Sequence, residues 1–342
     1  MTGGILNTSA AGNYALTVVG NLALGANGTL FANGSTITIG GNFSGTLTFV
    51  ASTSTVVFNG SGDQSIPTTF SFGNFHNLTI NKSGGTATLE NLIIVDGDLT
   101  ITAGTLATAN NAVTLNGNFS NGGTFTAGSS PITIGGTTTQ TIDGFTTTGL
   151  VSMTKTGGTA TFTGNVNGAG LTINGIGGAL NLGTGLTHSF TGTWTRSNGT
   201  LDGGSSTLNL VSTTAVSGTG AAFRASTGTV NCNAGGNQTI AAVTYNNLTL
   251  SSSGNKTLAS IITINGSVDI RDTAKFNLTY ASGSSSTVSG SVKFDGVIQS
   301  SGSWGSTISS ATFKEDTHFA VTTGTGKLTS STGSGALDHF AV

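Results

Sequence analysis

Charged side chains are scarce in this sequence. Asp, Glu, Lys and Arg together make up 6% of its 342 residues, against roughly a quarter in ordinary globular domains. No cluster of Lys or Arg is present to neutralise phosphates, so we expect no nucleic-acid partner. Disordered chains are usually charged and rich in proline, whereas this chain has only 2 prolines. We therefore expect an ordered protein whose surface is polar but nearly uncharged.

Cysteine and long apolar runs are equally rare. Cys232 is the only cysteine, which excludes an intrachain disulfide. Alternation places Cys232 on the same face as Val230, so it is predicted to be a small buried hydrophobe. No stretch reaches the ~20 apolar residues that a membrane-spanning helix needs. The sequence does not open with a charged segment followed by an apolar core, so we expect neither a signal peptide in it nor membrane insertion.

Motifs for catalysis, cofactors and metals are also missing. The four histidines show no metal-ligand spacing and no nucleophile motif surrounds them. Glycine-rich runs lack the Lys-Ser/Thr of a phosphate loop, and the tandem calcium-binding nonapeptide is absent. We expect no catalytic residue, no cofactor and no metal site. A lone calcium ion at Asp269, Asp272 or Asp295 is the alternative to simple surface charge there.

Glycine is abundant, with 55 residues, and it marks a repeat. One tag is Gly, a small polar residue and an apolar residue; close copies lie 20, 21 and 24 residues apart. A second tag is Gly-Thr-apolar. A fixed period in the twenties is the sequence sign of a repeat architecture. The first tag occurs at residues 20–22, 41–43, 97–99, 117–119, 164–166, 266–268 and 290–292.

A longer period lies over the short one. Gln-Ser/Thr-Ile ends a block at residues 64–66, 140–142 and 238–240. A new block opens about a dozen residues later, and Lys82 to Leu89 reappears as Lys155 to Phe162. The chain is thus predicted to consist of three blocks of roughly four coils each.

Short strands of alternating apolar and Thr residues separate the corners of these repeats. One coil cannot bury its inward side chains alone, but stacked coils give each strand a neighbour about 4.8 Å above and below. Gly and Asn are expected to take the positive-φ conformations of the corners, and corner Asn side chains to form ladders up the stack. The predicted fold is all-β, a right-handed parallel β-helix (β-solenoid) of about 14–17 coils.

The pattern changes near the C-terminus. Half of the charged residues, 11 of 22, lie in 265–342. We predict a solenoid over 1–328, in which 265–328 forms decorated coils that cap its end. The remaining 329–342 is predicted to be a flexible linker followed by the first strand of another module.

The repeats resemble the right-handed parallel β-helix repeats of large bacterial surface and secreted proteins, such as filamentous-haemagglutinin-like adhesins and autotransporter passengers. The resemblance covers roughly 1–328 and depends on segments such as Asn77-Leu78-Thr79-Ile80 and Gly104-Thr105-Leu106. It implies the architecture and an extracellular location at the bacterial cell surface, and it implies no particular activity.

Two sets of residues are candidates for chemistry or binding. Glu90, Asp96 and Asp98 form the densest acidic stretch, and a polysaccharide lyase or hydrolase would need such paired carboxylates; solvated corners are the alternative. Trp304 and Tyr280 are candidate glycan contacts, whereas Trp194 and Tyr245 are expected to pack in or beside the core.

The function that these observations favour is structural: an extracellular rod in a stalk, adhesin shaft or filament, without catalysis. A glycan-binding adhesin and a polysaccharide lyase or hydrolase are the alternatives. Arrays of Thr-x-Thr would also suit ice binding, but the uneven coil spacing argues against a lattice match. A surface with little charge gives little mutual repulsion, so end-to-end or side-by-side self-association is expected.

Overall fold

The computed structural model describes residues 4–25, 28–45, 48–66 and 74–333. In these ranges the chain is all-β, without a helix, and its parallel strands stack as a β-solenoid of about 14 turns. This confirms the predicted fold class, with a coil number at the lower end of the expected range. Among the same residues, no helix has the length and apolar character needed to cross a membrane.

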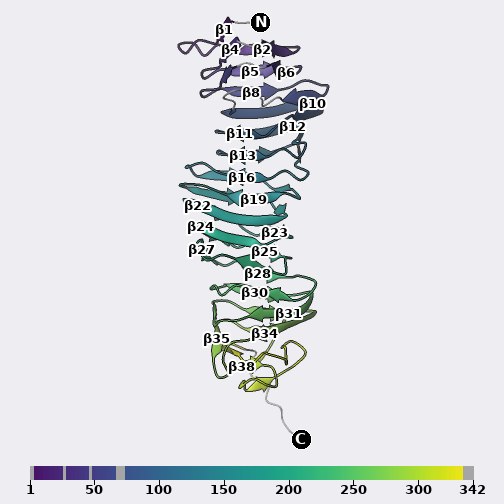
Figure 1. Cartoon of the computed structure of the whole chain (residues 1–342), viewed down its shortest axis with the longest axis vertical. Coiled ribbons are helices and arrows are strands. Elements are labelled where there is room, and N and C mark those ends of the chain that lie inside the picture. Colours follow the sequence, from purple (N-terminus) through teal and green to yellow (C-terminus); the bar gives the residue numbers. More distant parts are fainter. Residues whose placement is uncertain (1–3, 26–27, 46–47, 67–73, 334–342) are drawn as a thin grey trace. The chain divides into compact units, whose positions relative to one another are not determined.

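The chain divides into two compact units, Met1–Gly168 with Asn174–Leu180, and Ala169–Ile173 with Asn181–Val342. Within each unit, successive coils follow one another in chain order (Figure 1). The strands of the first unit are β1 (Gly4–Asn7), β2 (Leu16–Val18), β3 (Leu22–Leu24), β4 (Gly28–Phe31), β5 (Thr36–Ile39), β6 (Phe43–Gly45), β7 (Thr48–Val50), β8 (Thr55–Phe58), β9 (Gln64–Ile66), β10 (Asn77–Leu89), β11 (Ile93–Val95), β12 (Leu99–Ala107), β13 (Val113–Leu115), β14 (Phe119–Asn121), β15 (Thr124–Thr126), β16 (Ile132–Ile134), β17 (Gln140–Ile142), β18 (Phe145–Thr146), β19 (Leu150–Met153), β20 (Thr159–Phe162) and β21 (Val166–Gly168).

Strand β22 (Gly170–Asn181) contains residues of both units. The strands of the second unit are β23 (Thr187–Phe190), β24 (Trp194–Asp202), β25 (Thr207–Leu210), β26 (Val216–Ser217), β27 (Ala222–Arg224), β28 (Thr229–Cys232), β29 (Gln238–Thr239), β30 (Asn247–Leu250), β31 (Ser253–Leu258), β32 (Thr263–Ile264), β33 (Val268–Ile270), β34 (Thr273–Leu278), β35 (Ser285–Val288), β36 (Val292–Phe294), β37 (Val297–Ile298), β38 (Gly302–Gly305), β39 (Phe313–Lys314) and β40 (Lys327–Ser330).

Matching apolar residues of successive coils form internal columns. In the first unit, one column runs through Ile37, Val56, Leu78, Leu99 and Phe119, each paired in parallel register with the next. All five are 0–1% exposed. The residues that follow them, Thr38, Val57, Thr79, Thr100 and Ser120, lie in register on the other face and are half-buried or exposed. The period-2 pattern of the sequence is therefore the inside–outside pattern of the coil.

The lone cysteine belongs to a second column of inward residues. Leu210, Cys232, Leu250 and Ile270 follow one another in register through four coils of the second unit. Cys232 is 0% exposed, and burial raises the pKa of its thiol to about 12. The structure confirms the prediction of a small buried hydrophobe. Trp194 and Tyr245, each 0% exposed, are likewise confirmed as core residues.

Two different physical reasons determine which residues occupy the corners. At one type of corner, Asn33 and Asn110 adopt positive φ, as predicted for Asn at the bends. Ser52 and Ser226 adopt it as well, although only Gly and Asn were expected to do so. The glycine of the Gly-polar-apolar tag has another role. A Cβ on Gly97 would lie 2.3 Å from Asn77 Oδ1, with no positive φ involved. That glycine is required because a side chain of the preceding coil passes directly against it.

Antiparallel pairs join the parallel ones in the last coils, where β35 still pairs with β40 in parallel. Strands β36 and β37 form an antiparallel pair, as do β38 and β40. Thr329 and Ser330 belong to β40, so the predicted linker does not begin at residue 329. The rest of that prediction, residues 334–342, lies outside the described residues.

Candidate functional site

The three acidic candidates lie at corners of the first unit. Asp96 and Asp98 occupy the turn between β11 and β12, and Glu90 follows β10. All three are exposed. The spacing Asp-Gly-Asp therefore arises from a solvated corner, and each aspartate has a separate set of partners.

Asp98 belongs to a ladder of corner side chains. Asn77 Oδ1 accepts a hydrogen bond from the Asp98 N–H at 2.8 Å. Asp98 Oδ1 in turn accepts bonds from the Asn118 N–H at 2.8 Å and from Asn118 Nδ2 at 3.0 Å. Asn118 Oδ1 accepts the N–H of Thr141 at 2.9 Å. The polar residue of the repeat tag thus links each coil to the next, which confirms the predicted side-chain ladder in this part of the chain.

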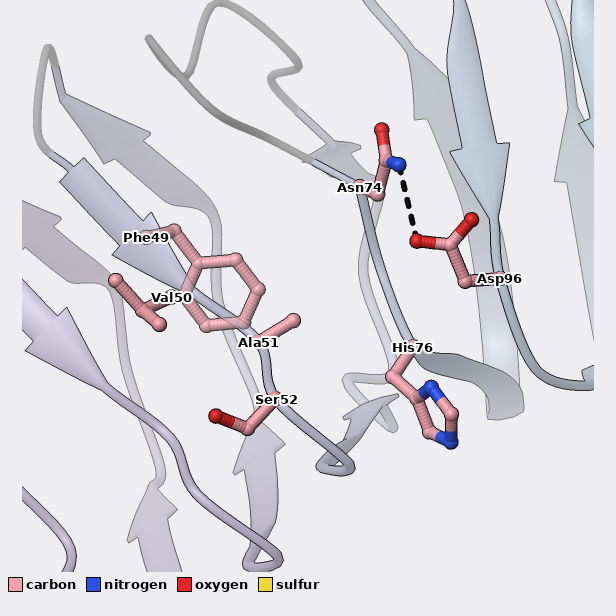
Figure 2. A pocket seen from close by; sticks show the side chains of 7 residues that line it. All are labelled: Phe49, Val50, Ala51, Ser52, Asn74, His76 and Asp96. Atoms are coloured by element: carbon pink, nitrogen blue, oxygen red, sulfur yellow. Dashed lines mark hydrogen bonds between the residues drawn. The ribbon is translucent and has the colours of Figure 1, made fainter.

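Asp96 contributes to a pocket of about 480 Å³. Its two carboxylate oxygens accept bonds from Asn74 Nδ2 and Asn116 Nδ2, both at 2.9 Å. Figure 2 shows the Asn74 amide facing this carboxylate, with His76 on the same side of the pocket. The opposite side is formed by the segment 49–52.

The pocket offers a carboxylate, an amide and an imidazole above an aromatic core. Phe49, in the segment 49–52, is 1% exposed and packs edge-on against Phe43 with ring centroids 5.9 Å apart. The size of the pocket falls within the range of small-molecule sites. Such a set can donate and accept hydrogen bonds to a hydroxylated ligand. Among the described residues, no group of three or more His, Cys, Asp or Glu is arranged to hold a metal ion.

The two aromatic glycan candidates lie in the last coils, where their rings are largely engaged. Tyr280 is 7% exposed, and its hydroxyl donates to the Lys327 carbonyl oxygen at 2.6 Å. That burial argues against a glycan contact at Tyr280. Trp304 is half-buried, stacks on Phe313 at 4.6 Å and meets Phe294 edge-on at 5.2 Å. The rings thus pack the end of the second unit.

His318 lies between two carboxylates in the same region. Its Nδ1 is 3.2 Å from Glu315 Oε2, and its Nε2 is 3.4 Å from Asp295 Oδ2. The imidazole stacks on Phe294 at 4.4 Å. Burial raises the pKa of Glu315, but the hydrogen bonds from His318 and Thr317 outweigh it and hold that pKa below its usual value. The cluster fastens the segment before β40 to the coil of β36.

Three lysines form sites that the sequence reasoning did not identify. Lys82, Lys155 and Lys256 are 0–2% exposed, and their ammonium groups are bound by oxygen atoms of the preceding coil. Lys82 Nζ donates to the carbonyls of Gly60 and Gly62, each at 2.8 Å, and to Gln64 Oε1 at 2.6 Å. The glutamine is the one that marks the end of a block.

The second site repeats this arrangement in full, and the third repeats its two carbonyl acceptors. Lys155 Nζ donates to the carbonyls of Gly135 and Thr138 and to Gln140 Oε1. Lys256 Nζ donates to the carbonyls of Ala234 at 2.6 Å and Gly236 at 3.1 Å, while Gln238 Oε1 accepts the N–H of Ala234.

Burial lowers the pKa of all three lysines, and Asp63 partly offsets this at Lys82. The sequence signal was a lysine 15–18 residues after the glutamine of each Gln-Ser/Thr-Ile tag. We name these three arrangements the lysine locks.

The polar side chains described above therefore serve mainly in contacts between coils, and the pocket beside Asp96 brings that sequence candidate together with an imidazole. A scan of protein-family models, a search of curated proteins and a search of solved structures gave no match to this chain.

Proposed function

We propose that this protein is a non-catalytic structural element, an extracellular spacer of a bacterial surface or filament protein. The observation that carries the proposal is the use of its polar side chains. The lysine locks, the corner ladder through Asn77, Asp98 and Asn118, and the outward pair of Asn209 and Asn231 all join one coil to the next.

Such contacts suit a protein that must keep its coils in register under load. The ladder hydrogen bonds of parallel strands act together, and the side-chain bonds add fixed points at the corners. A lysine that donates three bonds to the preceding coil opposes slippage, because a shift of one residue would leave a buried ammonium group without acceptors. The bacterial surface is proposed because the repeats resemble those of bacterial surface proteins.

Single-molecule force spectroscopy tests this function. The chain would be pulled from its ends, with an α-helical domain in the same tether as an internal reference. We expect coils of about 20 residues to open in steps of roughly 70 Å, from the reach of an extended chain, at forces above that of the helical reference. Opening of the solenoid before the helical domain would contradict a mechanical role.

Glycan binding is the second candidate, and the pocket in Figure 2 favours it. Asp96, Asn74 and His76 would supply acceptors and donors for sugar hydroxyls. A glycan array would be probed with the wild-type chain and with His76→Ala, and Ser226→Ala, an exposed corner residue of the second unit, is the control. Loss of array signals in His76→Ala alone would support binding at this pocket; an array without signals would exclude it for the glycans displayed.

A further inference from the structure

The segment between β39 and β40 lies along the edge of β34. We name this segment, residues 315–326, the closing segment. Strand β34 is the last of three strands in its sheet, after β29 and β31. The Phe276 N–H donates to the His318 carbonyl at 2.8 Å, and the Ala320 N–H donates to the Phe276 carbonyl at 3.1 Å. The closing segment thus pairs with backbone groups that β34 would otherwise leave open at its edge.

One set of contacts holds the closing segment to this coil without a histidine. Phe276 and Phe319 are bridged in parallel and are 0% and 1% exposed. Lys275 Nζ donates to the Asp316 carbonyl at 2.7 Å. These contacts keep the segment attached at any pH near neutrality, because none of them depends on a group that titrates there.

His318 supplies a second set of contacts, with two carboxylates. Its Nε2 is 3.4 Å from Oδ2 of Asp295, which follows β36. Its Nδ1 is 3.2 Å from Oε2 of Glu315, within the closing segment. The side chain is 13% exposed and lies flat on Phe294, with 4° between the ring planes. The ring is therefore held with a carboxylate oxygen at each nitrogen.

Both contacts together require a doubly protonated ring. A carboxylate oxygen only accepts hydrogen bonds, so a ring nitrogen must carry a hydrogen to bond to it. A neutral imidazole carries one such hydrogen, and its other nitrogen presents a lone pair to the second carboxylate. The imidazolium donates from both nitrogens, and the face of Phe294 also attracts its charge. Only the charged form of His318 satisfies this geometry in full.

The two carboxylates stay ionised where histidine side chains titrate. Hydrogen bonds from the Asp272 N–H and from His318 lower the pKa of Asp295, and the pKa of Glu315 is lowered as well. Their contributions to stability are therefore present above the ordinary values of 3.8 and 4.5, and they are lost as pH falls through the folded pKa values.

The other charged groups on the neighbouring elements are of types that keep their charge near neutrality. Arg271 pairs with Asp269 at 2.7 Å. Lys275 is bound to the Asp316 carbonyl, and the Asp316 carboxylate accepts bonds from residue 307. Lys293 precedes Phe294 in β36 and lies on the opposite face of that strand. Histidine is the side-chain type that ordinarily changes charge between pH 5 and 8.

We propose that His318 is a proton-dependent fastener of the closing segment. The segment is held most firmly to its coil while the imidazole is charged, and it loosens as rising pH removes the second ring proton. The contact with Asp295 or the contact with Glu315 is then lost, so β34 is uncovered more often. The contacts of Phe319 and Lys275 remain, so the segment loosens without unfolding. This inference is independent of the proposed mechanical role.

Hydrogen exchange of the full chain from about pH 5 to 8.5 tests the fastener. Exchange rates would be corrected for the intrinsic pH dependence of amide exchange. Peptides that cover the closing segment and β34 should lose protection about 3- to 10-fold as His318 is deprotonated, and NMR of the imidazole C–H signals follows that deprotonation in the same buffers. Peptides that cover β5 and β8 contain no ionisable residue, serve as the internal reference and should stay unchanged.

Three variants separate the proton from the fold. His318→Gln is neutral at every pH, so the closing segment should be weakly protected and independent of pH. Asp295→Asn removes one carboxylate, which is 59% exposed and so tolerates the change, and it should at least halve the loss of protection. Lys314→Gln removes an exposed charge beside the segment and should keep the wild-type pH dependence. Circular dichroism checks that each variant is folded, and Asp295→Asn decides the matter if His318→Gln does not fold.

Three results would overturn the proposal. The first is a wild-type closing segment whose protection stays constant over this pH range. The second is a pH-dependent loss of protection that persists in His318→Gln or is undiminished in Asp295→Asn. The third is a midpoint of the exchange transition that does not follow the NMR titration of His318.

Discussion

Replacement of Lys155 by methionine tests whether the lysine locks stabilise the solenoid. Lys155 is 0% exposed, and its ammonium group donates three hydrogen bonds, to Gly135, Thr138 and Gln140. Methionine has a similar shape but donates nothing, so three oxygen atoms of the preceding coil would lose this donor, those of Gly135 and Gln140 in buried contacts and that of Thr138 in a part-buried one.

Two opposing effects set the size of the stability change in Lys155→Met. Hydrogen bonds to a charged group contribute about 1.5–3 kcal/mol each, so three of them amount to about 5–9 kcal/mol. Burial of an ammonium group costs several kcal/mol, which the neutral methionine recovers. The loss of three hydrogen bonds outweighs this recovery, so we expect Lys155→Met to destabilise its coil by about 2–4 kcal/mol.

Hydrogen exchange is the suitable assay, because repeat arrays open locally and a global unfolding curve averages over their coils. Peptides that cover β16, β17, β19 and β20 should exchange about 30- to 900-fold faster in Lys155→Met. The control is Lys293→Met on the outer side of β36, where Lys293 is half-buried, and its effect should stay within about 0.5 kcal/mol.

A double-mutant cycle with Gln140→Leu isolates the pair of side chains. We expect a coupling of about 1–3 kcal/mol between positions 140 and 155, as for contacting residues in one network. Unchanged or slower exchange in Lys155→Met would refute the reasoning, because it would mean that the cost of burying the charge exceeds the contribution of its three hydrogen bonds.

Three further predictions follow from other parts of the structure. Gly97→Ala should destabilise its corner by about 1–3 kcal/mol in chemical denaturation, because the new Cβ would meet a side-chain oxygen of the preceding coil. Gly62→Ala is the control and should be nearly neutral, because a Cβ on Gly62 has no atom within 4 Å. Cys232 should react with a thiol reagent only after unfolding. Because burial raises the pKa of the Cys232 thiol to about 12, the thiol's contribution to the free energy of unfolding is fully present below pH 9 and is lost as pH rises toward 12. In denaturant titrations over this pH range, the wild type should therefore lose up to about 4 kcal/mol of stability that Cys232→Ala retains. The pKa of Glu315 is lowered, so its contribution to stability is present above its unfolded pKa of 4.5 and is lost as pH falls through the folded pKa. Acid should therefore change the fluorescence of Trp304, which lies in the same region, before the β-sheet content falls. Simultaneous loss of both signals would contradict this order.

Much of the fold could be predicted from the sequence because a solenoid depends on local patterns. Alternation of apolar residues with Thr predicted which side chains form columns such as Leu78, Leu99 and Phe119, and the structure confirms it. The tag at 97–99 predicted a corner and a ladder. Its glycine was expected to supply positive φ, but at Gly97 close approach of Asn77 is the actual reason.

The candidate sites were less predictable because they depend on contacts between coils. Asp96 and Asp98 are neighbours in sequence, yet each has partners in other coils, and the pocket joins Asp96 to residues near 50. Lys82 and Gln64 both mark blocks of the repeat, but their hydrogen bond could not be predicted, because a period shows that residues recur and not which side chains meet.

The sequence by itself determined the architecture: short strands with period 2, glycine-rich corners and a repeat of about 20 residues admit stacked coils and little else. Tertiary structure alone decided that three lysines lie inside, that Tyr280 is buried and that antiparallel pairs form among the last coils. The physical reason is that inside–outside alternation is a property of one strand, whereas hydrogen-bond partners and exposed edges arise from how neighbouring coils are set against each other.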